Sequence, residues 1–192
     1  MPRNVSAFHA PVRQDIRRWL ERAVIGLNLC PFAKAVHVKG QVHYAVSAAS
    51  DPQALLDDLE LELKALVAHD PQVRETTLLI TPQCLQQFAD FNDFLGEADA
   101  ALSRLALEGI IQIANFHPDY QFAGTDVNDI TNFTNRAPYP TLHLLREDSV
   151  ERAVAAFPEA ESIYEANMQT LEKLGHTGWD ALGVGPTLTK PD

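Results

Sequence analysis

The sequence lacks the features that mark several large classes of protein. It has two cysteines among 192 residues, too few for a disulfide framework and typical of a reducing cytosol. No apolar run approaches the roughly 20 residues that cross a bilayer. The first residues, MPRNVSAFHAPVRQ, lack the apolar core of a signal peptide. We therefore expect a cytoplasmic protein with no membrane partner.

Positive charge is also scarce, because 15 lysines and arginines stand against 26 acidic residues and the net charge is −11. This balance excludes nucleic-acid binding by net charge. The first 50 residues nevertheless hold seven bases and two acids. Four of these bases share one predicted helix: Arg13, Arg17, Arg18 and Arg22. The favoured interpretation is a solvated face with ion pairs to the acidic second helix. The alternative is a positive field beside an anion site, or a partner surface.

Known catalytic strings are missing as well. There is no Walker loop, G-x-G-x-x-G, G-x-S-x-G or EF-hand pattern, so nothing indicates a nucleotide, dinucleotide, serine-hydrolase or calcium site. The composition, with 46% apolar and 21% charged residues, is that of an ordinary globular protein. The length suits one domain. We expect residues 1–192 to form it, with an irregular tail from about residue 176.

Hydrophobic periodicity predicts alternating helices and strands. The expected helices cover about 11–28, 52–67, 82–108, 149–156 and 158–174, and the expected strands cover 41–47, 76–80, 110–116 and 140–146. Pro11 is expected in the first turn of its helix, and Gly175 is expected to end the last one. This order predicts an α+β fold: a four-stranded mixed or antiparallel sheet with about five helices, mostly on one face and ferredoxin-like in spirit. The last two strands are expected to pair antiparallel, because no helix separates them.

The interval 117–138 has no helix or strand pattern, and loops of this length are usually functional or disordered. Its aromatic residues favour an ordered loop, and its many asparagines and aspartates are typical of turns. Arg136 precedes two X-Pro pairs that restrict the backbone. Its guanidinium is expected either to bind a carboxylate or phosphate, or to pair with a loop aspartate. With Asn132, Asn135 and Tyr120, it forms the predicted binding site for a small anionic molecule.

Two histidines lie at the ends of this loop. If the third and fourth strands are neighbours, His117 and His143 are expected to approach each other at the mouth of the loop. With Asp119 they would offer a first shell for zinc or iron; otherwise they are hydrogen-bonded core residues. As catalytic groups they would act as acid and base, with Cys30 as nucleophile and Tyr139 as proton donor.

The two thiols differ in their expected surroundings. Cys30 follows the first helix, so no helix dipole is expected to lower the pKa of its thiol, and it is otherwise a small buried hydrophobe. Cys84 is expected in the first turn of the third helix, with no polar motif around it.

Three long strings, LNLCPFA, NFHPDYQF and TNRAPYPTLHLLRE, resemble in order and spacing a bacterial family catalogued as domain of unknown function 1415. The likeness extends from the WLERAVIGLNLCPFA helix to the YEANMQTLEKLG helix. The resemblance implies a bacterial, cytosolic, single-domain protein and carries no reaction, cofactor or catalytic residue.

Three functions therefore stay open. The first is a small enzyme that acts on an anionic molecule, metal-assisted or not, at the loop. The second is a non-catalytic module that binds a small anionic ligand or a protein partner, in which Arg136 and the asparagines matter and the histidines do not. The third is a structural protein whose loop only covers a hydrophobic sheet.

Overall fold

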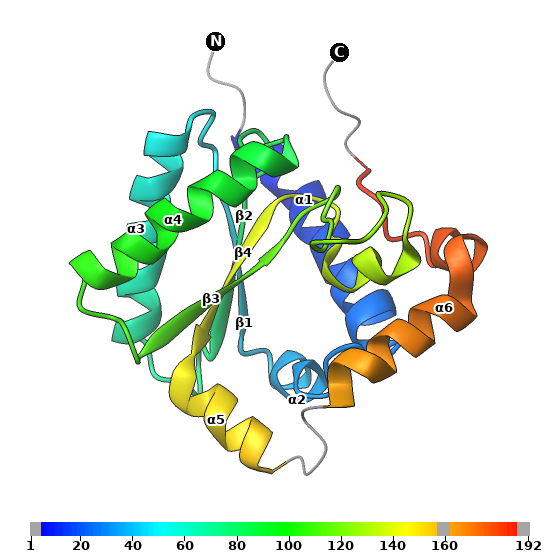
Figure 1. Ribbon diagram of the computed structural model, residues 1–192. Coiled ribbons are helices and arrows are strands. Elements are labelled where there is room, and N and C mark those ends of the chain that lie inside the picture. Colours follow the sequence, from blue (N-terminus) through cyan, green and yellow to red (C-terminus); the bar gives the residue numbers. More distant parts are fainter. Residues whose placement is uncertain (1–4, 157–161, 188–192) are drawn as a thin grey trace.

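The computed structural model describes residues 5–156 and 162–187. A four-stranded sheet runs through its centre, with helices on both faces (Figure 1). The strands are β1 (Val42–Val46), β2 (Thr76–Ile80), β3 (Ile111–Phe116) and β4 (Thr141–Arg146). The helices are α1 (Val5–Trp19), a π-helical continuation η1 (Leu20–Ile25), α2 (Ala33–Val38), α3 (Pro52–Ala68), α4 (Phe88–Arg104), a 3₁₀ helix η2 (Ile130–Asn135), α5 (Glu147–Ala155) and α6 (Ile163–Ala181). The predicted α+β class with a mixed four-stranded sheet is confirmed.

The strand order is β1-β2-β4-β3. β1 and β2 are parallel, and β4 lies between β2 and β3, antiparallel to both. The predicted antiparallel pairing of the last two strands is thus confirmed. Opposite His143 of β4 stand Leu78 of β2 and Ala114 of β3, so these three side chains share one face of the sheet.

Each face of the sheet has its own hydrophobic core. On one face, α3 contributes Leu55 and Leu59 and α4 contributes Phe91. On the other face, Ile16 and Trp19 of α1, together with residues of α6, pack against β2 and the loop before β4. The expectation that helices lie mostly on one face is therefore wrong, because the apolar stripes of α1 and α6 need a sheet face as much as those of α3 and α4 do.

Two predicted helix starts move in the structure. The first helix begins at Val5, so Pro11 lies inside it and not in its first turn. The third predicted helix begins at Phe88, and residues 81–87 form an irregular segment that holds Cys84. The short helix α2 had no sequence signal. By contrast, the predicted cap of α3 is confirmed, because the Asp51 carboxylate accepts a hydrogen bond from the Ala54 amide at 3.0 Å.

The last helix is interrupted where the sequence predicted its end. Gly175, with φ of 62° and ψ of 174°, is not helical, but helical residues resume beyond it and continue to Ala181. The irregular tail therefore starts after residue 181 and not at about 176. The predicted start at Pro158 lies outside the described residues.

Candidate functional site

The loop 117–138 contains the 3₁₀ helix η2, and its polar side chains bond mainly to the loop itself. Asn132 is fully buried. Its side-chain oxygen accepts hydrogen bonds from the Phe122 amide at 3.0 Å and the Thr125 hydroxyl at 2.8 Å. Its amide group donates to the Asp126 carbonyl at 2.9 Å. These three hydrogen bonds hold the loop together.

Arg136 is fixed in place, but not by the partners that the sequence suggested. Its Nε donates to the Tyr120 carbonyl at 3.0 Å and its Nη2 to the Val127 carbonyl at 2.8 Å. The guanidinium lies 4.4 Å from the centre of the Phe133 ring, a cation–π contact. Burial lowers the pKa of Arg136, and nearby Asp119 opposes this effect. The side chain ties two parts of the loop together, and no ion pair with a loop aspartate is found among the described residues.

The other predicted substrate ligands also have structural contacts. Asn135 donates to the Asn115 carbonyl at 3.2 Å, which joins the loop to β3. The Tyr120 ring packs against Phe88 and Phe122, and its backbone carbonyl receives Arg136. The side chains of these residues pack within the loop and do not converge on one cavity.

Tyr139 is buried, and its hydroxyl donates to a carboxylate oxygen of Asp15 at 2.8 Å. Asp15 also accepts hydrogen bonds from Arg18 at 2.6 Å and from the amide and hydroxyl of Thr187 at 2.8 Å. Burial raises the pKa of Asp15, but these hydrogen bonds together lower it. The predicted proton donor is therefore part of a buried network that joins α1 to the end of the described chain.

The two histidines lie on opposite faces of the sheet, which corrects the expectation that they approach each other. His117 is fully buried on the α4 side, against Phe88 and Phe91. Its Nδ1 accepts the Asp119 amide at 3.0 Å, so Nε2 carries the proton that reaches the Leu85 carbonyl at 3.1 Å. The strand register turns His143 to the opposite face, with Ala114 and Phe116.

This separation removes the geometry that the predicted metal site needs. His117 presents no lone pair toward His143, and the contact between His117 and Asp119 is made by the Asp119 amide. Within the described residues, no group of three or more histidine, cysteine or acidic side chains stands close enough to hold a metal ion. Nor does this part of the chain contain a helix that meets the length and hydrophobicity of a membrane span.

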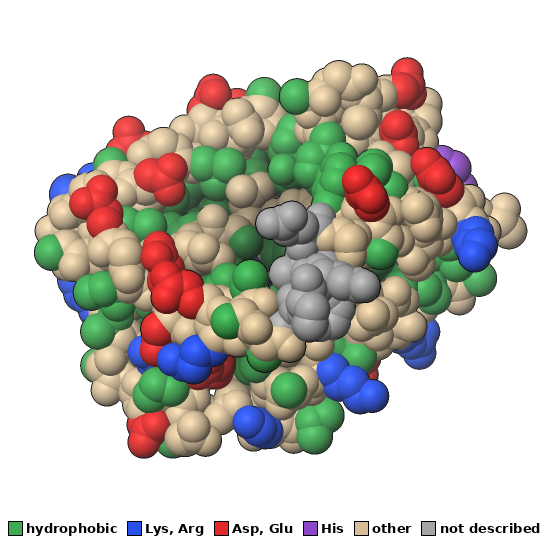
Figure 2. Space-filling model, turned by 60° about the horizontal axis from the view of Figure 1, so that its bottom comes forward, with side chains coloured by type: hydrophobic (Ala, Val, Ile, Leu, Met, Phe, Trp, Pro, Cys, Tyr) green, Lys and Arg blue, Asp and Glu red, His purple; other side chains and the backbone are tan. Residues whose placement is uncertain are grey.

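A cavity with a volume of about 540 Å³ lies over the face of the sheet that carries His143. Its floor is formed by side chains of all four strands, and its walls by the segment from Trp19 to Val36 and by α5. Most of the lining is apolar, as in Leu78, Ala114 and Phe116. In Figure 2 the face with α2 and α5 comes forward, and hydrophobic side chains gather around a hollow there.

His143 is the polar centre of the cavity floor. Its Nε2 lies 2.7 Å from the Thr76 hydroxyl, which donates to the Leu144 carbonyl at 2.6 Å. A hydroxyl has one proton, and a carbonyl can only accept. Nε2 must therefore carry the imidazole proton, and Nδ1 keeps a free lone pair. Burial lowers the pKa of His143 to about 4, so the ring is neutral at pH 7.

Cys30 lines the same cavity as His143. Contrary to expectation, it stands just before a helix, because α2 begins at Ala33, and the backbone amides of Phe32 and Ala33 donate toward its sulfur. Burial is the larger effect and raises the pKa of the thiol. No hydrogen bond joins Cys30 to His143 in the described structure. Cys84 is buried beside the α3–α4 core, and burial raises the pKa of its thiol too.

A family model described as a protein of unknown function (DUF1415) matches residues 11–181. The chain belongs to this family. The match covers the sheet, the loop 117–138 and both walls of the cavity, and it confirms the resemblance found in the sequence. No curated protein and no solved structure matches the chain.

Within this DUF1415 chain, sequence reasoning missed the residues that orient the candidate site. In the sequence, Thr76 is one residue of a predicted apolar strand. Its role was missed because nothing in a single sequence shows that β4 will place His143 beside it. Arg18 of α1 and Arg22 of η1 were also misassigned: they donate to carbonyls of residues 182–185, and neither pairs with α3 among the described contacts. Their regular spacing was the available signal.

Proposed function

We propose that this protein binds a small, largely apolar molecule in the cavity over the sheet. A volume of about 540 Å³ lies within the usual range for ligand pockets, which are mostly apolar with a few placed polar groups. We keep the cytosolic location expected from the sequence as part of this proposal. The observation that carries it is the fixed acceptor on the floor, the Nδ1 lone pair of His143.

The chemistry of that acceptor defines the ligand. The Leu144 carbonyl and Thr76 hydroxyl hold the ring in one tautomer, so Nδ1 accepts and does not donate. A hydroxyl or N–H group on the ligand matches it. A carboxylate does not, because a neutral imidazole with an exposed lone pair repels an anion. Arg146 also lines the cavity, but its Nη2 already donates to the carbonyls of Leu66, His69 and Arg74.

The sequence suggested an enzyme with a histidine and Arg136 at the loop. One observation supports catalysis at another place: Cys30 and His143 line the same cavity. Nucleophilic catalysis requires the thiol to lose its proton to the base. Burial raises the pKa of Cys30 and lowers that of His143, so the thiolate–imidazolium pair is strongly disfavoured. Binding without catalysis is therefore the better supported function, and thiol chemistry is the second candidate.

The test compares two probes that differ by one hydroxyl group, 1-naphthol and naphthalene. Titration calorimetry or fluorescence of the wild-type protein should show 1-naphthol binding roughly 2- to 10-fold more tightly, the worth of one net hydrogen bond. His143→Phe should remove this difference while naphthalene still binds. Ala114→Phe, which places a ring in the cavity floor, should weaken both.

The matched control is His43→Phe. His43 lies on β1 with its side chain on the other face of the sheet, beside Glu62, and the change should leave both affinities as in the wild type. If neither probe binds, or if Ala114→Phe leaves both affinities intact, the cavity is not the ligand site.

A further inference from the structure

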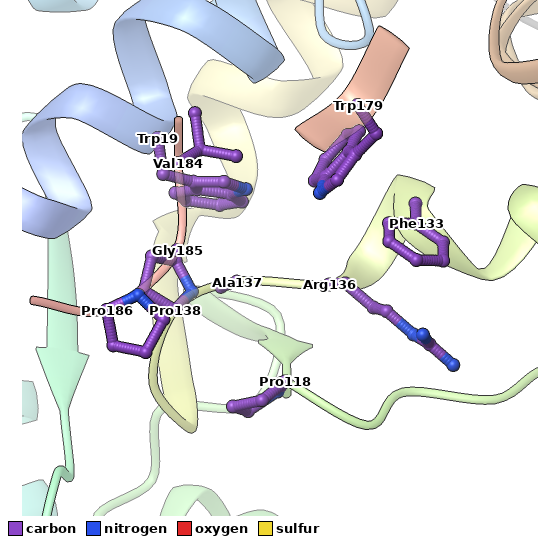
Figure 3. A pocket seen from close by; sticks show the side chains of 10 residues that line it. All are labelled: Trp19, Pro118, Phe133, Arg136, Ala137, Pro138, Trp179, Val184, Gly185 and Pro186. Atoms are coloured by element: carbon purple, nitrogen blue, oxygen red, sulfur yellow. The ribbon is translucent and has the colours of Figure 1, made fainter. Parts of the chain in front are cut away.

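A second, smaller pocket lies outside this cavity, between the end of α1 and the end of α6 (Figure 3). Its volume is about 150 Å³. Its opposite walls are the indole rings of Trp19 and Trp179, and prolines of the loop and of the chain after α6 close its lower side. The remaining lining residues are Pro118, Phe133, Arg136, Ala137, Pro138, Val184, Gly185 and Pro186.

The two indole N–H groups are the unusual feature of this pocket. Trp19 and Trp179 are 2% and 9% exposed, yet neither indole N–H has a hydrogen-bond acceptor within the described residues. Figure 3 shows the nitrogen ends of both rings turned toward each other across the pocket. An indole nitrogen can only donate. Neither nitrogen is among the buried polar atoms that lack a partner in the described structure, so both donors face the open space of the pocket. The pocket therefore offers two convergent donors and suits a ligand with acceptor oxygens.

The charges around the pocket favour an anion. Arg18 and Arg22 donate to the carbonyls of Leu182, Gly183 and Gly185, so two guanidinium groups stand behind that wall. Arg136 lines the pocket from the loop side. On the acidic side, Asp15 is paired with Arg18 and Asp119 faces Arg136.

The shape limits the size and type of the anion. A cavity of 150 Å³ admits a group about the size of benzene, and the lining between the two donors is made of proline, phenylalanine and valine side chains. A phosphate is too strongly hydrated to be held by two neutral donors. A carboxylate has two oxygens for the two N–H groups and can carry a compact apolar body.

We propose that the pocket between Trp19 and Trp179 is a binding site for a small monocarboxylate, whose oxygens accept hydrogen bonds from the two indole N–H groups. The apolar body of the ligand packs against the proline rings and Phe133. This site is distinct from the neutral-ligand site over the sheet: Trp19 lines both, but Trp179 lines only this pocket of the two. If the carboxylate site fails its test, the proposed function is unaffected. If the proposed function fails its test, the carboxylate site is unaffected.

The chain has two tryptophans in total, so each indole N–H gives one resonance in a ¹H–¹⁵N spectrum and both report on this pocket. The full chain is titrated with benzoate and, as a neutral probe of the same shape, with benzyl alcohol. Both indole resonances should move downfield with one dissociation constant for benzoate. Because Trp19 also lines the cavity over the sheet, the affinity of benzyl alcohol for this pocket is read from the Trp179 resonance, and it should be at least roughly tenfold weaker than that of benzoate.

Trp179→Phe keeps an aromatic ring and removes one donor. It should weaken benzoate binding roughly 10- to 100-fold, as expected for a hydrogen bond to a charged acceptor. Tyr164→Phe, an exposed position on the same helix, is the matched control and should bind as the wild type does. Trp19→Phe is the second variant and should have the same effect as Trp179→Phe.

Three outcomes would overturn the proposal. The first is that neither indole resonance moves up to roughly 10 mM benzoate. The second is that benzyl alcohol binds as tightly as benzoate. The third is that Trp179→Phe folds, as its amide spectrum would show, and binds benzoate with unchanged affinity.

Discussion

A single side chain, His143, links the cavity to the pH dependence of folding. Burial holds its pKa at about 4 in the folded protein, against 6.5 when it is unperturbed. The unfolded chain therefore takes up a proton between these two values while the folded chain does not. Unfolding is favoured as the pH falls through this window, and stability rises again with pH.

We expect the free energy of unfolding to fall by about 2 kcal/mol from pH 7 to pH 5 because of this one group. Urea unfolding at the two pH values measures the change. His143→Phe should remove that part of the slope and leave the part due to His9 and His43, whose pKa values are also lowered by burial. A variant with the full wild-type slope would show that His143 is not held neutral by the fold.

At this scale the sequence identified the right residue types but not their partners. Proline restriction correctly predicted that Arg136 is fixed, yet its acceptors are the carbonyls of Tyr120 and Val127, and backbone carbonyls leave no trace in a side-chain pattern. Cys30 and His143 were both named as candidates, and one cavity holds them. The Thr76 contact depends on strand order, which periodicity does not contain.

Among the structural elements, the loop 117–138 depends most on a single buried amide. Asn132 satisfies the Phe122 amide and the Asp126 carbonyl at once. We expect Asn132→Ala to lower the free energy of unfolding by about 1–3 kcal/mol, since the Phe122 amide loses its partner, whereas the Asp126 carbonyl keeps the Asp129 amide. Denaturant unfolding gives this value, and hydrogen exchange at the Phe122 amide should become faster.

The matched control for the loop is Asn128→Ala. Asn128 lies in the same loop, is exposed, and has no side-chain hydrogen bond among the described contacts. Its replacement should change stability by less than about 0.5 kcal/mol. Equal losses for the two asparagines would mean that the loop is not held through Asn132.

Helix and strand positions were predicted well where periodicity and caps agree, as at Asp51 and the start of α3. They were predicted poorly where one residue decided alone. Pro11 is tolerated inside α1, because the packing of Trp19 outweighs its local preference. Gly175 interrupts α6 as predicted, but the chain beyond it is helical again and packs Trp179 into the core.

In the whole molecule, the two faces of the sheet are packed differently, and neighbouring residues of β4 report on each. Leu144 is fully buried in the α3–α4 core, whereas Leu145 faces the cavity. Leu144→Ala should cost about 3–4 kcal/mol of stability. Leu145→Ala should cost about 1–1.5 kcal/mol, because a side chain beside an open space has fewer contacts to lose.

Thermal or urea unfolding of this pair tests whether the cavity exists in the ligand-free protein. If Leu145→Ala costs as much as Leu144→Ala, side chains fill the space in solution. The strand order that makes the faces differ could not be read from the sequence. Inserting β4 between β2 and β3 is a long-range choice, and the register of β4 against β3 is what places His117 and His143 on opposite faces.

The network around Asp15 also bears on how the chain reaches this state. Thr187 bonds to Asp15 across 172 positions and Gly183 to Arg18 across 165. On a ribosome that adds about 5–20 residues per second, the first helix therefore waits roughly 10–30 s before its final partners are made. Until then its apolar face has only the part of its native cover that comes from β2 and the loop before β4, because Leu171 and Trp179 of α6 are still missing. The first helix is thus a segment of the nascent chain that a chaperone can protect until α6 is made.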